Sequence, residues 1–221
     1  MIRGAPIGKH FEHATLENFE VTQFNRIGYE ACQKLVKGDT LGVVLRGPVG
    51  VGKTHLLVGL AKSFLNVRAP NAANDETVEV QPISKIMENT SPSSETEPER
   101  VLLSRLELMH DPEVEFWPML DLASELRAEV MHGELYLSRR CRMCDLLILD
   151  DLGREKLTDF ILQEFQRIVD WRYREEKPIA VATNRLPEEI IERYGENTYS
   201  RWKETCEIAE VTGPDLRLGR D

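Results

Sequence analysis

The chain has 221 residues, of which 41% are hydrophobic and 30% are charged, and its formal net charge is −10 at pH 7. A chain of this length can bury a full core, and this composition excludes a wholly disordered protein. No run approaches the roughly eighteen apolar residues of a membrane span, and the first residues lack an apolar stretch of signal-peptide length. We therefore expect a globular cytoplasmic protein with no membrane partner.

The first expected helix lies in the N-terminal part of the chain. Phe24, Ile27, Ala31 and Leu35 recur at helical spacing, and Gly38 follows them as a stop signal. Further along, short apolar runs alternate with amphipathic stretches, the pattern of a parallel sheet covered by helices. We expect strands at 41–45, 114–120, 146–149, 178–182 and 208–211, and helices at 55–65, 122–131, 160–174 and from Pro187 onward.

An acidic segment interrupts this alternation. Between residues 71 and 99 acids far outnumber bases, and residues 89–98 include no aromatic or apolar side chain. Such a segment has little apolar surface to offset the entropy lost on ordering. We therefore expect a flexible surface insertion at about 69–112.

Eight consecutive residues fit the pattern G-x-x-x-x-G-K-[ST] of a P-loop. They follow an expected strand and precede an expected helix, the context that this motif requires. Its glycines let backbone N–H groups approach phosphate oxygens, its lysine reaches the β- and γ-phosphates, and its hydroxyl ligates Mg²⁺. We expect ATP and Mg²⁺ here, with these nucleotide contacts: Gly47, Pro48, Val49, Gly50, Val51, Gly52, Lys53, Thr54 and His55.

Polar residues end two later strands. Asp150 and Asp151 directly follow the apolar run 146–149, and Asn184 follows the strand expected at 178–182. Ligands of open α/β sheets bind at the carboxyl ends of the strands. We therefore expect Asp150 to hold Mg²⁺ together with Thr54, Asp151 to be the base, and Asn184 to orient the attacking water.

A cysteine pair and a group of bases lie before the acid-bearing strand. Cys141 and Cys144 have the spacing of a metal or redox pair, but no second ligand pair follows, so packing is the favoured role. The nearby bases suit nucleic-acid binding, and a solvated helical face would give the same pattern. These bases are Arg127, Arg139, Arg140 and Arg142.

Several segments together resemble a known family. The P-loop, residues 146–153, Thr183-Asn184, Ser200-Arg201 and residues 212–217 occur in the order of the AAA+ ATPases. They look most like the DnaC/IstB-type helicase loaders and transposition helpers. The resemblance covers roughly residues 10–66 and 113–217.

The resemblance implies a P-loop NTPase fold, a three-layer αβα sandwich around a parallel five-stranded sheet of order 5-1-4-3-2, with little or no C-terminal helical lid. It implies a lead-in and first helix at 1–40 and an AAA+ ATPase domain at 41–221 that contains the insertion. By position, Asp151 takes the place of the catalytic acid and Asn184 that of the sensor of the γ-phosphate. Arg201 takes the place of an arginine finger that acts in trans within a homo-oligomer, and Arg217 that of a second nucleotide sensor.

The function expected from these features is ATP hydrolysis coupled to work on a nucleoprotein. The resemblance implies a helicase, a transposase or another replication or transposition protein as partner, together with single-stranded DNA. Two alternatives stay open on the residues alone. One is a P-loop kinase that phosphorylates a small molecule, and the other is a nucleotide-dependent interaction module with little turnover.

Overall fold

The computed structural model of the chain describes residues 1–68, 111–131 and 136–216. Of these, residues 1–67, 112–131 and 136–216 form one compact unit. The expected insertion at about 69–112 falls almost wholly outside the described residues, and Arg217 lies outside them too. Within the described part of the chain, no helix is both long enough and apolar enough to cross a membrane.

The described residues form one six-stranded sheet in which every pair of neighbours is parallel, with the order β1-β3-β4-β5-β2-β6. The strands are β1 Ile2–Gly4, β2 Gly42–Arg46, β3 Val114–Pro118, β4 Leu146–Leu152, β5 Ile179–Thr183 and β6 Cys206–Glu210. Without β1, this order is the expected 5-1-4-3-2 read from the other edge, so the predicted arrangement is confirmed. The prediction of five strands was too low, because the lead-in adds β1 to the free edge of β3, with Ile2 opposite Val114.

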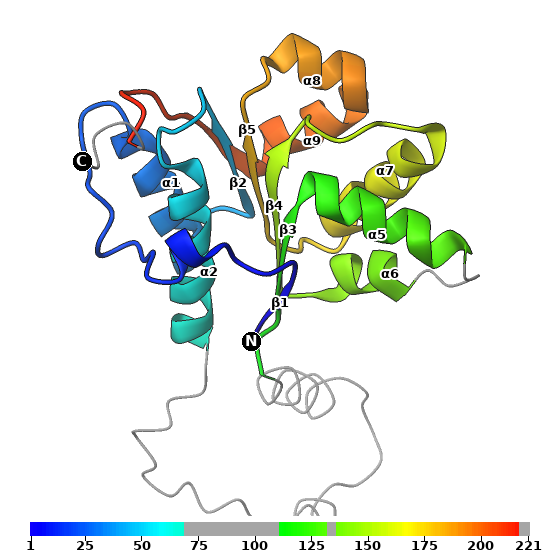
Figure 1. Ribbon diagram of the computed structural model, residues 1–221, viewed down its shortest axis with the longest axis horizontal. Coiled ribbons are helices and arrows are strands. Elements are labelled where there is room, and N and C mark those ends of the chain that lie inside the picture. The colour runs from blue at the N-terminus through cyan, green and yellow to red at the C-terminus, as the bar shows by residue number, and fades with distance from the viewer. Residues whose placement is uncertain (69–110, 132–135, 217–221) are drawn as a thin grey trace, which may run out of the picture. The chain divides into compact units, whose positions relative to one another are not determined.

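Helices cover both faces of the sheet, as Figure 1 shows. They are α1 Arg26–Lys37, α2 Lys53–Arg68, α5 Met119–Met131, α6 Tyr136–Met143, α7 Asp159–Arg174, α8 Pro187–Tyr194 and α9 Glu196–Thr205, with a short 3₁₀ turn η1 at Lys9–Phe11. Alternate residues of each strand face opposite layers. Val43 and Leu45 pack with α1 and α2, whereas Val44 packs with the helices on the other face.

Most expected strands and helices differ from the structure by one to three residues at an end; for example, 55–65 is α2 Lys53–Arg68 and 146–149 is β4 Leu146–Leu152. The strand expected at 114–120 ends at Pro118, and α5 begins directly afterwards at Met119 instead of Leu122. Pro118 has no N–H with which to continue a strand ladder. The last strand runs from Cys206 to Glu210. It therefore begins two residues before, and ends one residue before, the expected strand at 208–211. Helices α6 and α9 were not expected at all, because they are short and their sequences are mostly polar.

Helix α1 buries only part of the face that its apolar spacing predicts. Ala31 and Leu35 are buried as expected, whereas Ile27 is 62% exposed and Phe24, just before the helix, is 48% exposed. The other buried positions are Gly28 and Cys32. A Cβ atom at Gly28 would lie only 2.6 Å from Cγ2 of Val211. The close approach through Gly28 therefore decides which face is buried.

Candidate functional site

The P-loop joins the carboxyl end of β2 to the start of α2. Gly50 and Gly52 have φ angles of 85° and 98°, in the left-handed region that side chains disfavour. The loop can therefore turn tightly and present backbone N–H groups, while the first turn of α2 adds the positive end of a helix dipole. This arrangement is a site for an anion.

The side chain of Lys53, near the end of the P-loop, contacts the backbone at the start of that loop. Its side chain is largely buried, and Nζ donates hydrogen bonds to the carbonyl oxygens of Gly47 at 2.8 Å and Pro48 at 2.6 Å. An ammonium group held at the inner side of an anion cradle can act as a point charge on phosphate oxygens.

Thr54 and Asp150 meet beside the P-loop, although they are far apart in the sequence. The Thr54 hydroxyl donates to Oδ2 of Asp150 at 2.8 Å, and the N–H of Asp151 donates to Oδ1 at 3.0 Å. Burial raises the pKa of Asp150 from 3.8 to about 6, and the hydrogen bond from Thr54 partly opposes that rise. A hydroxyl and a carboxylate are oxygen ligands of the kind that Mg²⁺ prefers, so these residues fit the expected metal.

A bulge in β4 gives the two neighbouring acids opposite surroundings. Leu149 pairs with Val181 and Leu152 with Thr183, so β4 carries one extra residue where the acids stand. Asp151 has a φ angle of 53°, and its side chain is half exposed and ion-paired with Arg154 at 2.9 Å. The bulge thus directs Asp150 to Thr54 and leaves Asp151 at the mouth of the site.

An open pocket of about 470 Å³ adjoins these groups, within the usual size range of small-molecule sites. Its lining residues are His10, Phe11, Val49, Gly50, Gly52, Lys53, Thr54, His55, Asp151 and Leu216. No motif marks His10 and Phe11 as site residues, because the lead-in reaches the pocket only through the tertiary fold.

His55, in α2, also contacts residues of the N-terminal lead-in. Its Nε2 lies 3.0 Å from the carbonyl oxygen of Thr15 and 2.9 Å from Oδ1 of Asn18, and its ring meets Phe19 edge-on. The expected contact of His55 with nucleotide stays a prediction, with this structural role beside it.

The other expected site residues lie in three different places. Asn184 is exposed and directly follows β5, at the same edge of the sheet as the P-loop. Arg201 lies at the opposite edge, in a small pocket with Leu41 and Ile179, where the strands begin. The chain therefore does not bring Arg201 to its own P-loop. Arg217 cannot be placed, although the N–H of the preceding residue, Leu216, donates to the carbonyl of Gly50 at 3.0 Å.

Three of the bases near the cysteine pair have partners within the fold, among them Arg142, which donates to the carbonyl of Ser138 at 3.4 Å. Arg140 pairs with the buried carboxylate of Glu115 at 2.6 Å, and Arg127 donates to the carbonyl of Lys156 at 2.5 Å. Arg139 is exposed. The guanidinium of Arg172 donates to the carbonyl and Sγ of Cys144, which binds the end of α6 to α7.

Comparison with known proteins places this geometry in context. No model of a protein family matches the chain. The DnaA chromosomal replication initiator of Campylobacter jejuni is 24% identical over 208 residues, which are 91% of this chain and 37% of the relative. The chain thus spans little more than a third of the curated relatives that it matches.

Solved structures of replication proteins share the fold. The DnaC helicase loader has a TM-score of 0.66 at 19% identity, over 92% of this chain and 99% of that one. DnaI has a TM-score of 0.62 at 18% identity, over 98% and 97%. A replication initiator DnaA bound to AMPPCP and single-stranded DNA has a TM-score of 0.64 at 21% identity, over 91% and 50%.

A parallel sheet of this order, with a P-loop after β2 and paired acids at the end of β4, defines the fold of a P-loop AAA+ domain. Within that class the chain resembles the DnaC-type helicase loaders, which confirms the resemblance seen in the sequence. The described residues after β6, 211–216, contain no helix.

Proposed function

We propose that the protein binds ATP with Mg²⁺ at the P-loop. The main support for this proposal is the hydrogen bond between Thr54, at the end of the motif, and Asp150, at the end of β4. Lys53 and the first turn of α2 would hold the β- and γ-phosphates. Thr54 and Asp150 would hold Mg²⁺, which neutralises phosphate charge when bound. The contacts expected of residues 47–55 and of Arg217 with the nucleotide belong to this proposal.

The chemical step that we propose is hydrolysis to ADP and phosphate. Water attacks the γ-phosphorus, the bond to the β-phosphate oxygen breaks, and the proton of the water passes to a base. Asp151 suits that role because its carboxylate is half exposed at the mouth of the pocket. Asn184, beside it at the end of β5, would orient the water.

The proposed working form is a cytoplasmic homo-oligomer in which Arg201 of one subunit completes the site of the next. The likeness to the DnaC helicase loader supports a helicase as partner. The likeness to the replication initiator DnaA bound to single-stranded DNA supports a role in replication with that DNA as a second partner. A transposition protein as partner rests on the sequence resemblance alone. The proposed domain organisation is the one expected above, with residues 41–221 as the ATPase domain.

The substitution Asp151→Asn separates binding from chemistry. An amide cannot accept the proton of the water, so the variant should bind ATP like the wild type and lose most of its turnover. Asp39→Asn, at an exposed acid in the turn after α1, should keep both properties. The assay measures ATP affinity, ADP and free phosphate together. With a panel of candidate phosphoacceptors present, ADP formed without free phosphate would indicate a kinase that transfers the γ-phosphoryl group to one of them. Full turnover by Asp151→Asn would place the base elsewhere.

A further inference from the structure

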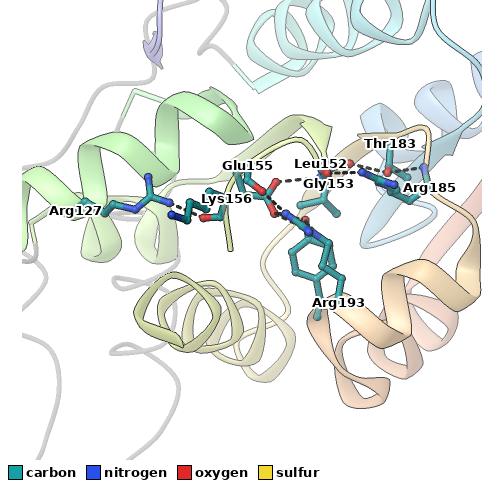
Figure 2. Close-up of polar contacts among 9 residues, drawn as sticks. Arg127, Leu152, Gly153, Glu155, Lys156, Thr183, Arg185 and Arg193 are labelled. Carbon is teal, nitrogen blue, oxygen red and sulfur yellow. Dashed lines mark hydrogen bonds and ion pairs between the residues drawn. The ribbon is translucent and has the colours of Figure 1, made fainter. Parts of the chain in front are cut away.

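Side chains hold the backbone directly after Asp151 at three points. The Thr183 hydroxyl donates to the carbonyl of Leu152 at 2.8 Å, and Arg185 donates to the carbonyl of Gly153 at 3.0 Å. The N–H of Gly153 donates to Oε2 of Glu155 at 3.0 Å. Figure 2 shows these contacts around the loop that follows β4. The loop is therefore held both by the end of β5 and by Glu155.

Glu155 is a fully buried carboxylate with donors on both oxygens. Besides the N–H of Gly153 on Oε2, its Oε1 accepts hydrogen bonds from Nε of Arg193 at 3.1 Å and from Nη2 at 3.0 Å. The Tyr194 hydroxyl donates to the same Oε1 at 2.6 Å. The side chain of Glu155 has no exposed surface. A buried charge held this fully joins the loop after β4 to the last turn of α8.

The loop has little room to adopt another path. A Cβ atom at Gly153 would lie 2.6 Å from Cγ of Arg185, and the same arginine pairs with Glu189 in α8 at 2.9 Å. Asp151 itself has a φ angle of 53°, which costs free energy for a residue other than glycine and persists only where the surroundings hold it. The hydrogen bonds that Thr183, Arg185 and Glu155 make with residues 152 and 153 supply such surroundings, and we call these hydrogen bonds the clamp.

We propose that Glu155 is a positioning residue that fixes where the Asp151 carboxylate stands at the mouth of the nucleotide pocket. The inference rests on the proposed hydrolysis of ATP. None of the hydrogen bonds of the clamp goes to Lys53, Thr54 or Asp150, so we expect its loss to leave nucleotide binding intact. A displacement of the base by about 1 Å is enough to cost on the order of a hundredfold in rate.

The substitution Glu155→Gln breaks the clamp with a minimal change of shape. An amide offers one acceptor oxygen, so its NH₂ group must face either the N–H of Gly153 or the donors of Arg193 and Tyr194. We expect kcat to fall by about tenfold or more. The dissociation constant and KM for ATP should stay at their wild-type values.

Glu115→Gln is the matched control. Glu115 is also a buried carboxylate paired with an arginine, Arg140, and it also accepts a hydrogen bond from an aromatic side chain, Trp117. It stands near the start of β3, away from the pocket. Loss of this ion pair should lower stability in the same way and leave kcat unchanged. Equal losses of kcat in the two variants would show a purely structural effect and overturn the proposal.

A double-mutant cycle tests whether Glu155 acts through Asp151. In the Asp151→Asn background, Glu155→Gln should lower the residual turnover no further, because the base that it positions is already gone. A further loss equal to that in the wild-type background would contradict the proposal. Tyr194→Phe removes one hydrogen bond from Glu155 and keeps the ring, so it provides the same test with a smaller loss of kcat if Glu155→Gln fails to fold.

The wild-type assay separates the two proposals. A wild type that binds ATP without releasing phosphate would contradict the proposed function itself. A wild type that hydrolyses ATP, with Glu155→Gln at full kcat, would contradict only the positioning role.

Discussion

Asp150 and Asp151 are neighbours in the chain with different surroundings. The bulge in β4 buries the first against Thr54 and exposes the second beside Arg154. Environments that differ in this way assign different roles to chemically identical groups. Asp150 suits metal binding because its oxygens converge with a hydroxyl, and Asp151 suits proton transfer because water reaches it.

The pKa of Asp150 predicts a pH-dependent cost to stability. Burial raises this pKa from 3.8 to about 6, so the folded protein binds the proton more tightly than the unfolded chain does. The free energy of unfolding therefore falls as pH rises from about 4 to about 6, and above that range the buried charge costs up to about 3 kcal/mol.

Asp150→Asn removes that cost, because the amide can accept from the N–H of Asp151 and donate to Thr54. Without Mg²⁺ and nucleotide, we expect the variant to be more stable than the wild type at pH 8, and the difference should vanish near pH 4. Urea unfolding at the two pH values measures this. A difference that is the same at both values would show that the carboxylate titrates normally.

The sequence predicted the residues with a fixed motif and missed those defined only by tertiary contacts. The P-loop and the two acids are recognisable because their chemistry needs those residue types in that order. Glu155 lies between Arg154 and Lys156, so by sequence it reads as part of a polar loop. Its burial depends on Arg193 and Tyr194, almost forty positions later, and no local pattern shows that contact.

Among the helices, α1 shows how a close approach overrides apolar spacing. Gly28 faces Val211 and Leu45, and Ile27 beside it is exposed to solvent. Apolar periodicity marks the helix correctly here and includes the buried Ala31 and Leu35, but it misses Gly28 at the centre of the buried face, because glycine contributes nothing to a hydrophobic pattern.

Gly28→Val should destabilise the protein, although valine is the better helix former. Its side chain would overlap that of Val211, and overpacking of this kind costs about 1–3 kcal/mol. Ile27→Ala, at the neighbouring exposed position, should change the free energy of unfolding by less than about 0.5 kcal/mol. Urea unfolding of both variants measures the contrast. A larger effect at Ile27 than at Gly28 would mean that α1 packs through the face its apolar residues suggest.

Elements with strong apolar runs were predicted, and those that depend on a neighbour were not. Strands β2, β4 and β5 are buried on both faces and read as continuous apolar runs. Strand β1 has three residues and forms by pairing with β3. Its own residues carry too little signal to predict it.

For the molecule as a whole, the position of Arg201 bears on how catalysis is organised. Arg201 is ion-paired with Asp170 and stacks over Tyr173, with 5.4 Å between its guanidinium carbon and the ring centroid, at the sheet edge opposite the P-loop. An arginine held there cannot complete the P-loop site of its own subunit. Sharing in trans, worth about 10³–10⁵ in rate where an arginine finger acts, stays a prediction.

Mixing two inactive variants tests that sharing. Lys53→Ala can still donate Arg201, and Arg201→Ala can still bind ATP, so mixed assemblies contain some complete sites. We expect each variant alone to hydrolyse ATP poorly and the mixture to regain activity, and wild-type turnover per subunit should rise with protein concentration. Full activity of Arg201→Ala alone would contradict sharing.

The expected acidic insertion provides a separate prediction for the whole chain. Replacing residues 71–99 by a short Gly/Ser linker should leave the melting temperature and basal ATPase activity nearly unchanged, because its composition offers little to a core. Thermal unfolding and phosphate release measure the two properties. A large drop in melting temperature would show that the segment packs against the domain.

The substitution Lys53→Ala tests whether the P-loop binds ATP for hydrolysis. The ammonium of Lys53 is the expected charge on the β- and γ-phosphates, so its loss should weaken ATP binding and abolish phosphate release. Lys37→Ala, at an exposed lysine that ends α1, should match the wild type in both measurements. The unfolding transition should persist in both variants. If Lys53→Ala matches the wild type in ATP affinity and phosphate release, the P-loop is not the site of ATP hydrolysis.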